Sequence, residues 1–241
     1  MSSKPMPPTD PLALIRRSIG LCQMMRNWPA PVLDTLAAAA RLGRYARHEQ
    51  ILAEDPLRRE VLVVASGGVA VDSVDASGAR FLLSIHGPGE ITALMRLLED
   101  VGFVYDFHAR EPTVLVHIPA DALLGALDAH PPLWRDVCVL MLSRAHEQIV
   151  MRQQGTLGAL DCQLANAVVQ LARVHGRIAQ GSATLHVRVS QSDLAAMLSV
   201  SRQTVNKELR RLEQRGLLHA EYGRLEILDL PGLEWLAQGR P

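Results

Sequence analysis

The sequence has few of the residues from which several common kinds of site are built. It contains three cysteines among 241 residues, and they stand far apart, at positions 22, 138 and 162. An odd number of cysteines at such distances gives neither a disulfide framework nor a CxxC metal or redox pair. Three buried, reduced thiols are therefore expected.

A long apolar run and a net charge are missing too. No run approaches the roughly 18 apolar residues that are typical of a membrane-spanning helix. The first 15 residues hold four prolines instead of a basic start followed by an apolar stretch. These features predict a soluble, cytoplasmic protein with no membrane partner. The 25 basic and 25 acidic residues balance, which argues against a globally basic nucleic-acid coat but allows a local basic patch.

Motifs of common catalytic sites are also absent from the sequence. It contains no GxSxG elbow, P-loop, HExxH motif or paired-carboxylate motif. Two adjacent acidic pairs, Glu54-Asp55 and Glu99-Asp100, lie near turn signals, and neighbours in sequence do not usually converge on one substrate atom. The sequence therefore predicts a protein that is not an enzyme and has no metal site.

The pattern of apolar residues changes along the first half of the chain. Apolar residues recur every three and four positions at 12–26 and at 29–42, which predicts two short helices. From 61 to 119, short valine-rich runs alternate with turn signals such as Ser66-Gly67-Gly68, which is typical of an antiparallel roll, barrel or sandwich. We interpret residues 1–26 as a helical extension and residues 27–130 as a β-domain.

A long helix is predicted after Pro131-Pro132. Residues 133–154 hold no Gly or Pro over about six turns, and Gly155 and Gly158 are expected to interrupt the helix. The stretch 137–142 is apolar all round, so two sides must be buried. A second copy of the chain is the economical partner, and burial within one monomer is the alternative. Residues 131–156 are thus assigned to dimerisation, through a stripe comprising Trp134, Cys138, Met141, Ala145 and Ile149.

The last part of the chain, residues 157–241, carries the signals of a winged helix-turn-helix. An amphipathic helix is predicted at 160–174, followed by a loop at 173–182. Ser190 with Asp193 three positions on is a capping box, and 199–201 forms a tight connection to a helix at about 202–214. Alternating apolar residues on either side of Tyr222-Gly223 predict the two strands of a wing.

The helix at 202–214 presents two different faces. Val205, Leu209 and Leu212 share the inward face. The opposite face carries arginine, amide and lysine side chains, which suit guanine, adenine and phosphate respectively. Residues 201–215 include five basic and two acidic side chains, a local charge of +3 in a neutral chain. We predict DNA contacts from Ser201, Arg202, Gln203, Thr204, Asn206, Lys207, Arg210 and Arg211. An ordinary helical pair with solvated arginines is the alternative.

The segment SVSRQTVNKELRRLEQRGLL, preceded by SQSDLAAML, resembles the DNA-binding segment of the CRP/FNR family of bacterial transcription regulators. The resemblance implies an α+β fold with an N-terminal antiparallel β-roll of the cyclic-nucleotide-binding type, a long dimerisation helix and a C-terminal winged helix-turn-helix. It also implies a homodimer that reads an inverted repeat in double-stranded DNA, with RNA polymerase as a candidate partner. Arg202, Gln203, Asn206 and Lys207 fall where family members place base or phosphate contacts.

The resemblance is weaker in the cassette with which some family members bind a cyclic nucleotide. The residues 88–92 match its lead-in. In the family's cassette a Gly-Glu pair meets the ribose, but the next two positions here are Ala93 and Leu94. The Arg-Ser pair that meets the cyclic phosphate falls near Phe103-Val104. An apolar pair supplies no charge for a cyclic phosphate, although Arg96 or Arg110 could serve instead. We expect a different effector, in a pocket that includes Gly89, Glu90, Ala93, Leu94, Phe103, Val104 and Tyr105.

No cofactor is expected from the cysteines or histidines. The family's iron–sulfur sensors carry a cysteine cluster near the N-terminus, where this chain has only Cys22. Haem would need a strand histidine such as His86, His108 or His117, and such residues are more often hydrogen-bonded than ligating. The leading hypothesis is a DNA-binding regulator. The alternatives are a ligand-binding module with a protein-contacting winged helix, or a cyclic AMP- or cyclic GMP-responsive regulator with a divergent cassette.

Overall fold

The computed structural model describes residues 10–51, 59–74, 80–98, 105–157, 159–175, 177–178, 185–221 and 223–238. The chain divides into two compact units, which are described separately below. One comprises Met1–Ser73 and Ser84–Met141, and the other Val74–Leu83 and Leu142–Pro241. The sequence-based boundaries at residues 26, 130 and 156 stay predictions. Among the described residues, every helix is too short or too polar to span a bilayer.

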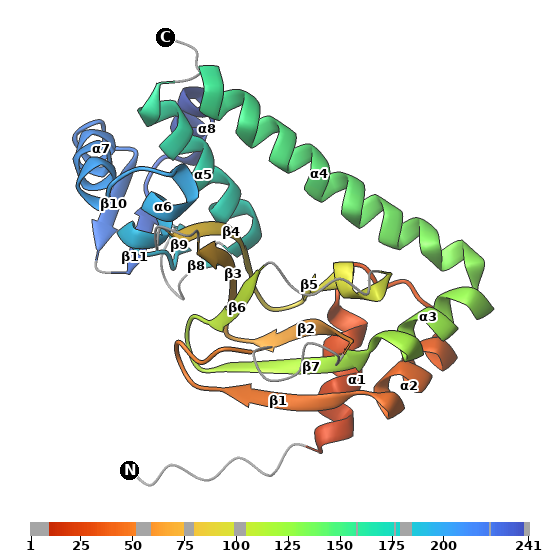
Figure 1. Ribbon diagram of the computed structural model, residues 1–241. Helices are drawn as coiled ribbons and strands as arrows, with labels where there is room; N and C mark the ends of the chain where they lie inside the picture. The colour runs from red at the N-terminus through yellow and green to blue at the C-terminus, as the bar shows by residue number, and fades with distance from the viewer. Residues whose placement is uncertain are drawn as a thin grey trace, which may run out of the picture. The chain divides into compact units, whose positions relative to one another are not determined.

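Antiparallel strands dominate the N-terminal half (Figure 1). One sheet has the order β1-β7-β2-β5 and another the order β4-β3-β6. The helices α1 and α2 pack against β2 and β7 of the first sheet. The elements are α1 (Pro11–Leu21), α2 (Ala30–Ala39), β1 (Arg41–Tyr45), β2 (Glu60–Ser66), β3 (Val69–Val74), β4 (Arg80–His86), β5 (Ile91–Thr92), η1 (Leu94–Leu97), β6 (Asp106–Ala109), β7 (Thr113–Pro119), α3 (Ala120–Ala129) and η2 (Pro131–Leu133).

The core of this half lies between the helices and one face of the first sheet. Val61 and Val63 of β2 and Val116 and Ile118 of β7 are fully buried there, because alternate strand residues point to the same face. The helices contribute apolar residues at helical spacing to the same cluster, including Ile19 and Leu36. The valine-rich runs of the sequence therefore build the sheet that was predicted from them.

The first predicted helix ends earlier than its pattern indicated. The pattern extends to residue 26, but α1 ends at Leu21 and Cys22 adopts an extended backbone. The N–H of Gln23 then donates to the carbonyl of Gly89 at 3.0 Å. This long-range bond competes with helical continuation and is invisible in local periodicity. The second helix stops at Ala39 instead of residue 42, because the chain from Arg41 pairs with β7.

The long helix α4 runs from Trp134 to Leu157 as one element. The prediction that Gly155 interrupts it is wrong, since that residue lies within the last turn. A helical glycine costs about 1 kcal/mol relative to alanine, which a helix of this length can absorb. Gly158 lies outside the described residues.

The C-terminal half is a helical domain with a small sheet (Figure 1). Its described strands form one sheet of order β10-β11-β9-β8. The predicted loop at 173–182 is partly wrong, because α5 continues to His175 and Arg177–Ile178 forms a strand. The elements are α5 (Leu160–His175), β8 (Arg177–Ile178), β9 (Leu185–Val187), α6 (Gln191–Leu198), α7 (Arg202–Gln214), β10 (Leu218–Glu221), β11 (Arg224–Ile227) and α8 (Leu230–Ala237).

Candidate nucleic-acid interface

Helices α6 and α7 are fixed by two side-chain caps and a tight turn. The hydroxyl of Ser190 accepts the N–H of Asp193 at 3.1 Å, and the Asp193 carboxylate accepts the N–H of Ser190 at 3.3 Å, which completes the predicted capping box. Ser199 ends α6 in the left-handed conformation, at φ 53°. The hydroxyl of Ser201 then caps α7 by accepting the N–H of Thr204 at 3.1 Å. The turn thus sets where α7 begins.

The inward face of α7 matches its prediction. Val205 and Leu209 are 1% exposed and Leu212 is fully buried. These apolar anchors fix the rotation of the helix, so the side chains on its opposite side must face away from the core, whereas Glu208, next to Leu209, is buried with the anchors. The wing is held to the same helix, because the Glu213 carboxylate accepts the N–H of Ala220 in β10 at 2.8 Å.

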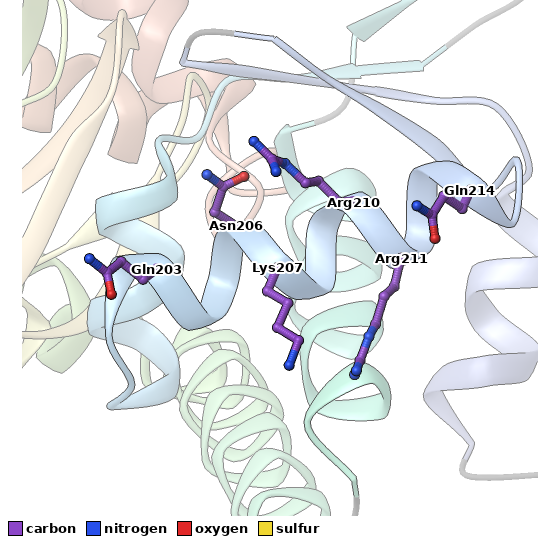
Figure 2. A pocket seen from close by; sticks show the side chains of 6 residues that line it. All are labelled: Gln203, Asn206, Lys207, Arg210, Arg211 and Gln214. Carbon is purple, nitrogen blue, oxygen red and sulfur yellow. The ribbon is translucent and has the colours of Figure 1, made fainter.

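The outward face of α7 is polar and lines an open hollow of about 390 Å³. Figure 2 shows Lys207 and Arg211 extending on one side of the helix, and Asn206 and Arg210 on the other. Gln203 and Gln214 complete the lining. Three amides and three cations therefore line the outward face of α7, and such side chains suit base edges and phosphates.

Two of the predicted contact residues have a structural task at the start of α7. The hydroxyls of Ser201 and Thr204 lie 2.7 Å apart and form one hydrogen bond, and Ser201 also caps the helix. Arg202, the first helical residue, is exposed beside them. A DNA contact from Ser201 or Thr204 stays a prediction.

The cations of this domain differ in whether a carboxylate neutralises them. Arg211 pairs with Glu208 at 2.7 Å, Arg215 lies 3.9 Å from Asp161, and Arg224 of the wing pairs with Glu221 at 2.6 Å. Within the described part of the chain, no ion pair involves Arg202, Lys207 or Arg210. Arg202, Lys207 and Arg210 are thus exposed cations on α7 whose charge no carboxylate of the described residues offsets.

The predicted dimerisation stripe is exposed on α4 except at its first residue, Trp134. Val137 is buried in the core of the N-terminal unit, and Trp134 and Leu140 pack partly against that core. The remaining stripe residues, Cys138, Met141, Ala145 and Ile149, are exposed in the single chain. Neighbouring apolar residues are exposed too, including Val139 at 54% and Leu142 at 70%.

Most of the described residues of the predicted effector pocket bond to neighbouring backbone or are buried in the core. Gly89, at φ 86°, donates its N–H to the carbonyl of Val64, and the Glu90 carboxylate accepts the N–H of Gly87 at 2.5 Å. Ala93 has a left-handed backbone, and Leu94 is buried in the apolar core. Phe103 and Val104 lie outside the described residues, and Tyr105 is half-buried.

The arginines in and near this segment are at least partly buried in the protein. Arg96 is 5% exposed, so its side chain lies within the protein rather than on its surface. Arg59 donates to the carbonyls of Arg96 and Leu97, the latter at 2.7 Å. The sequence did not single out Arg59, because its partners are main-chain atoms more than 35 residues away. Arg110 is half-buried.

A buried polar cluster in the first sheet was not recognised from the sequence. His117 is fully buried, with Nδ1 2.8 Å from a Glu60 oxygen and Nε2 2.8 Å from the Tyr45 hydroxyl. Arg41 donates to both Glu60 oxygens, at 2.8 and 3.2 Å. Burial alone would raise the pKa of the Glu60 carboxyl, but the bonds from Arg41 and His117 outweigh it and lower that pKa. Both His117 nitrogens are thus occupied within the protein.

The other two strand histidines also have nearby polar partners. His86 Nε2 lies 3.0 Å from the Ser84 hydroxyl, and His108 Nδ1 lies 3.6 Å from an oxygen of Asp72. Among the described residues, no three or more His, Cys, Asp or Glu side chains form a group that could hold a metal ion. Of the cysteines, Cys22 is buried, whereas Cys138 is exposed and Cys162 is half-buried, so the expectation of three buried thiols holds for Cys22 only.

A β-roll followed by a winged helix with an exposed cationic face defines the chain as a transcription regulator. Comparison with known proteins agrees. A model of the Crp-like helix-turn-helix domain matches residues 163–236, and one of the cyclic nucleotide-binding domain matches residues 42–130. The chain belongs to the CRP/FNR family of transcription regulators, which are not enzymes.

Individual relatives resemble the chain over most of its length. It is 24% identical over 237 residues to the HTH-type transcriptional regulator Cmr of Mycobacterium tuberculosis, covering 96% of this chain and 92% of that protein. It is 25% identical over 195 residues to the Cyclic AMP receptor protein of Thermus thermophilus, covering 81% and 87%. The structure of FixK2 from Bradyrhizobium japonicum shares the fold, with a TM-score of 0.70 and 18% identity over 82% of this chain and 96% of that one.

Proposed function

We propose that the protein is a homodimeric regulator that binds an inverted repeat in double-stranded DNA and responds to an effector other than a cyclic nucleotide. One observation carries the DNA-binding part of the proposal. Arg202, Lys207 and Arg210 stand on the exposed face of a capped, rigidly packed α7, without an ion-pair partner among the described residues. A fixed helix with such a surface fits the major groove.

The roles on this face follow from side-chain chemistry. Arg202, Gln203 and Asn206 would specify sequence, because guanidinium and amide groups make bidentate bonds to base edges. Lys207 and Arg210 would contact phosphates and set the register of the helix on the duplex. Two subunits would place their α7 helices in successive major grooves about 34 Å apart, which is one turn of DNA.

The homodimer is supported by the exposed apolar side of α4. Several large apolar side chains between positions 138 and 149 of α4 are exposed, and it is costly to leave them in water. A second α4 related by a two-fold axis would cover them. Contact with RNA polymerase follows from the family alone and is proposed on that basis.

Cys138 offers a direct test of the dimer. It is exposed and lies in the predicted stripe, so two copies would face each other across the axis. Mild oxidation should produce a disulfide-linked dimer from the wild type and from Cys162→Ser, but none from Cys138→Ser. A chain that sediments as a monomer and does not cross-link through Cys138 would contradict the proposed seam.

The effector proposal is supported by Ala93 and Leu94. Leu94 is buried in the core at the position where the family's cassette has a glutamate, so it offers no carboxylate to a ribose. Addition of cyclic AMP or cyclic GMP should leave the melting temperature unchanged, because only a ligand that binds the folded state stabilises it. A saturable rise in melting temperature with either nucleotide would contradict this part of the proposal. Native mass spectrometry of the protein, purified without added ligand, would identify any effector that it retains.

Binding to random duplex DNA over a series of salt concentrations tests the core of the proposal. Affinity should fall steeply with salt, because protein cations release phosphate-bound counterions when they bind. A variant with Lys207→Gln and Arg210→Gln should show a slope shallower by roughly 1.8 per subunit, at about 0.9 for each phosphate contact. Weak binding that is insensitive to salt would favour a winged helix that contacts protein instead.

A further inference from the structure

Glu208 occupies an unusual place for an acidic residue on a DNA-reading helix. It is 6% exposed, on the side of α7 that packs inward. Its two carboxylate oxygens both accept from Nη1 of Arg211, at 2.7 and 3.0 Å. The Arg211 side chain is 57% exposed, so the guanidinium stands at the surface above a carboxylate that water scarcely reaches.

This burial makes the pair hard to separate. Moving Arg211 onto a phosphate would leave an ionised carboxylate buried without its cation, which is far more costly than exposing one in water. Arg211 is therefore held in place and its charge is offset. Its Nη2 and Nε groups remain able to donate, since both bonds to Glu208 come from Nη1.

The neighbouring cations behave differently. Lys207 stands one turn before Arg211 on the same side of the helix, as Figure 2 shows, and it has no ion pair within the described residues. Arg210, on the other side, likewise has none there. The same helix thus carries cations of two kinds, one held by a carboxylate and the others able to move toward phosphate.

We propose that Glu208 is a positioning residue that determines specificity by holding Arg211 and offsetting its charge. This inference rests on the proposed DNA binding. Sequence-independent attraction would then come from Lys207 and Arg210, while Arg211 would contribute a directed hydrogen bond at one fixed position. Glu208 would limit binding to random DNA and so widen the gap between operator and bulk DNA.

Glu208→Gln tests the inference, because glutamine keeps the shape of the side chain and removes its charge. The freed Arg211 should reach a phosphate and steepen the salt slope on random duplex DNA by about 0.9 per subunit. Affinity for random DNA at 0.1 M salt should rise about fivefold to tenfold for each subunit that binds, since each gains one phosphate contact. Affinity for the duplex enriched from a random pool should rise less, so the ratio between the two should fall.

Glu213→Gln is the matched control. It removes the same charge from the same helix, while glutamine can still accept the N–H of Ala220. It should leave the salt slope unchanged. In an Arg211→Ala background, Glu208→Gln should lose its effect on the slope, because the residue through which it acts is gone. An equal effect of the two Glu→Gln changes, or persistence of the effect without Arg211, would overturn the inference.

A second comparison keeps Glu208 itself and so does not depend on the folding of the Glu208 variant. Lys207→Gln should reduce the slope by about 0.9, and Arg211→Gln by less than half as much. Equal reductions would overturn the inference, as would an unchanged slope in a folded Glu208→Gln protein whose operator preference is normal. Absence of any operator preference in the wild type would instead contradict the proposed function, and this inference with it.

Discussion

Two of the arginine–glutamate pairs in this protein lie in opposite settings. In the β-roll, Arg41 pairs with buried Glu60, and His117 and Tyr45 complete a cluster in which the polar groups bond one another. On α7, Arg211 pairs with Glu208, but the same helix carries further cations that form no ion pair with a carboxylate among the described residues. The roll cluster is matched internally and has a structural role. The unpaired positive charge on α7 would attract an anion from outside the protein.

The largest loss of stability and DNA binding should follow removal of an apolar anchor of α7. Leu209→Ala deletes a side chain that is 1% exposed, and such changes cost about 2–5 kcal/mol. The C-terminal domain should unfold at lower denaturant, and DNA binding should be lost with it. Chemical denaturation followed by circular dichroism measures the effect, with exposed Gln203→Ala as the control. Normal stability of Leu209→Ala would mean that α7 does not pack as described.

Loss of a partner in the roll cluster should affect stability but not DNA binding. Arg41→Gln should destabilise the N-terminal unit by about 1–3 kcal/mol at neutral pH, less than for a fully buried pair, because the Arg41 side chain is 42% exposed. Denaturation at pH 7 measures this, and the salt slope on DNA should match that of the wild type. A changed slope would show that the two regions are not independent.

The same variant should alter the response to acid. The folded-state pKa of Glu60 lies below its ordinary value of 4.5, so its stabilising contribution is present above that value and is lost as pH falls through the folded pKa. Without Arg41, burial is less opposed and the pKa of Glu60 rises. Between pH 6 and the acid transition, Arg41→Gln should therefore lose less stability than the wild type. A larger acid loss in the variant would reverse the assigned sign.

Removal of the Arg202 side chain should reduce DNA affinity at one base position rather than reduce stability. Arg202→Ala should cost about 1–3 kcal/mol at one base position of each half-site, because a bidentate guanine contact is lost. Competition between duplexes that differ at single positions measures it, with stability checked by denaturation. If affinity and base preference both stayed unchanged, the reading face would be assigned to the wrong residues.

The smallest effect should come from the α6 cap. Ser190→Ala removes the hydroxyl that accepts the Asp193 N–H, and loss of such a cap costs about 1 kcal/mol. Ser190→Thr keeps a hydroxyl that accepts the same bond and donates to the Asp193 carboxylate, as Ser190 does at 2.9 Å, so it should retain most of the stability. Melting temperatures of the two variants decide the point, and equal losses would indicate that the hydroxyl does not stabilise α6.

Local signals predicted the DNA-binding domain well and the roll less completely. The helix at 202–214 was placed at the bounds it has in the structure, because Ser201 caps it and Val205, Leu209 and Leu212 repeat at helical spacing. The wing followed from the turn at Gly223 and alternating strands. Each of these signals lies within a few residues of the element it determines.

What the sequence did not disclose depends on residues far apart in the chain. His117 and Glu60 are 57 positions apart, and β-pairing alone brings them together. The early end of α1 depends on Gly89, and the ion pair at Arg211 depends on a rotamer that sequence spacing permits but does not require. Strands β8 and β9 and helix α8 were likewise not expected, since they are short and form part of the domain by packing.

Selection of duplexes from a random pool by the purified protein tests the central claim most directly. The account predicts enrichment of an inverted repeat with half-sites about one helical turn apart. A protein carrying Arg202→Ala, Lys207→Gln and Arg210→Gln should enrich nothing from the same pool. Equal enrichment by the wild type and this variant, or none by either, would contradict the claim that the exposed face of α7 reads DNA.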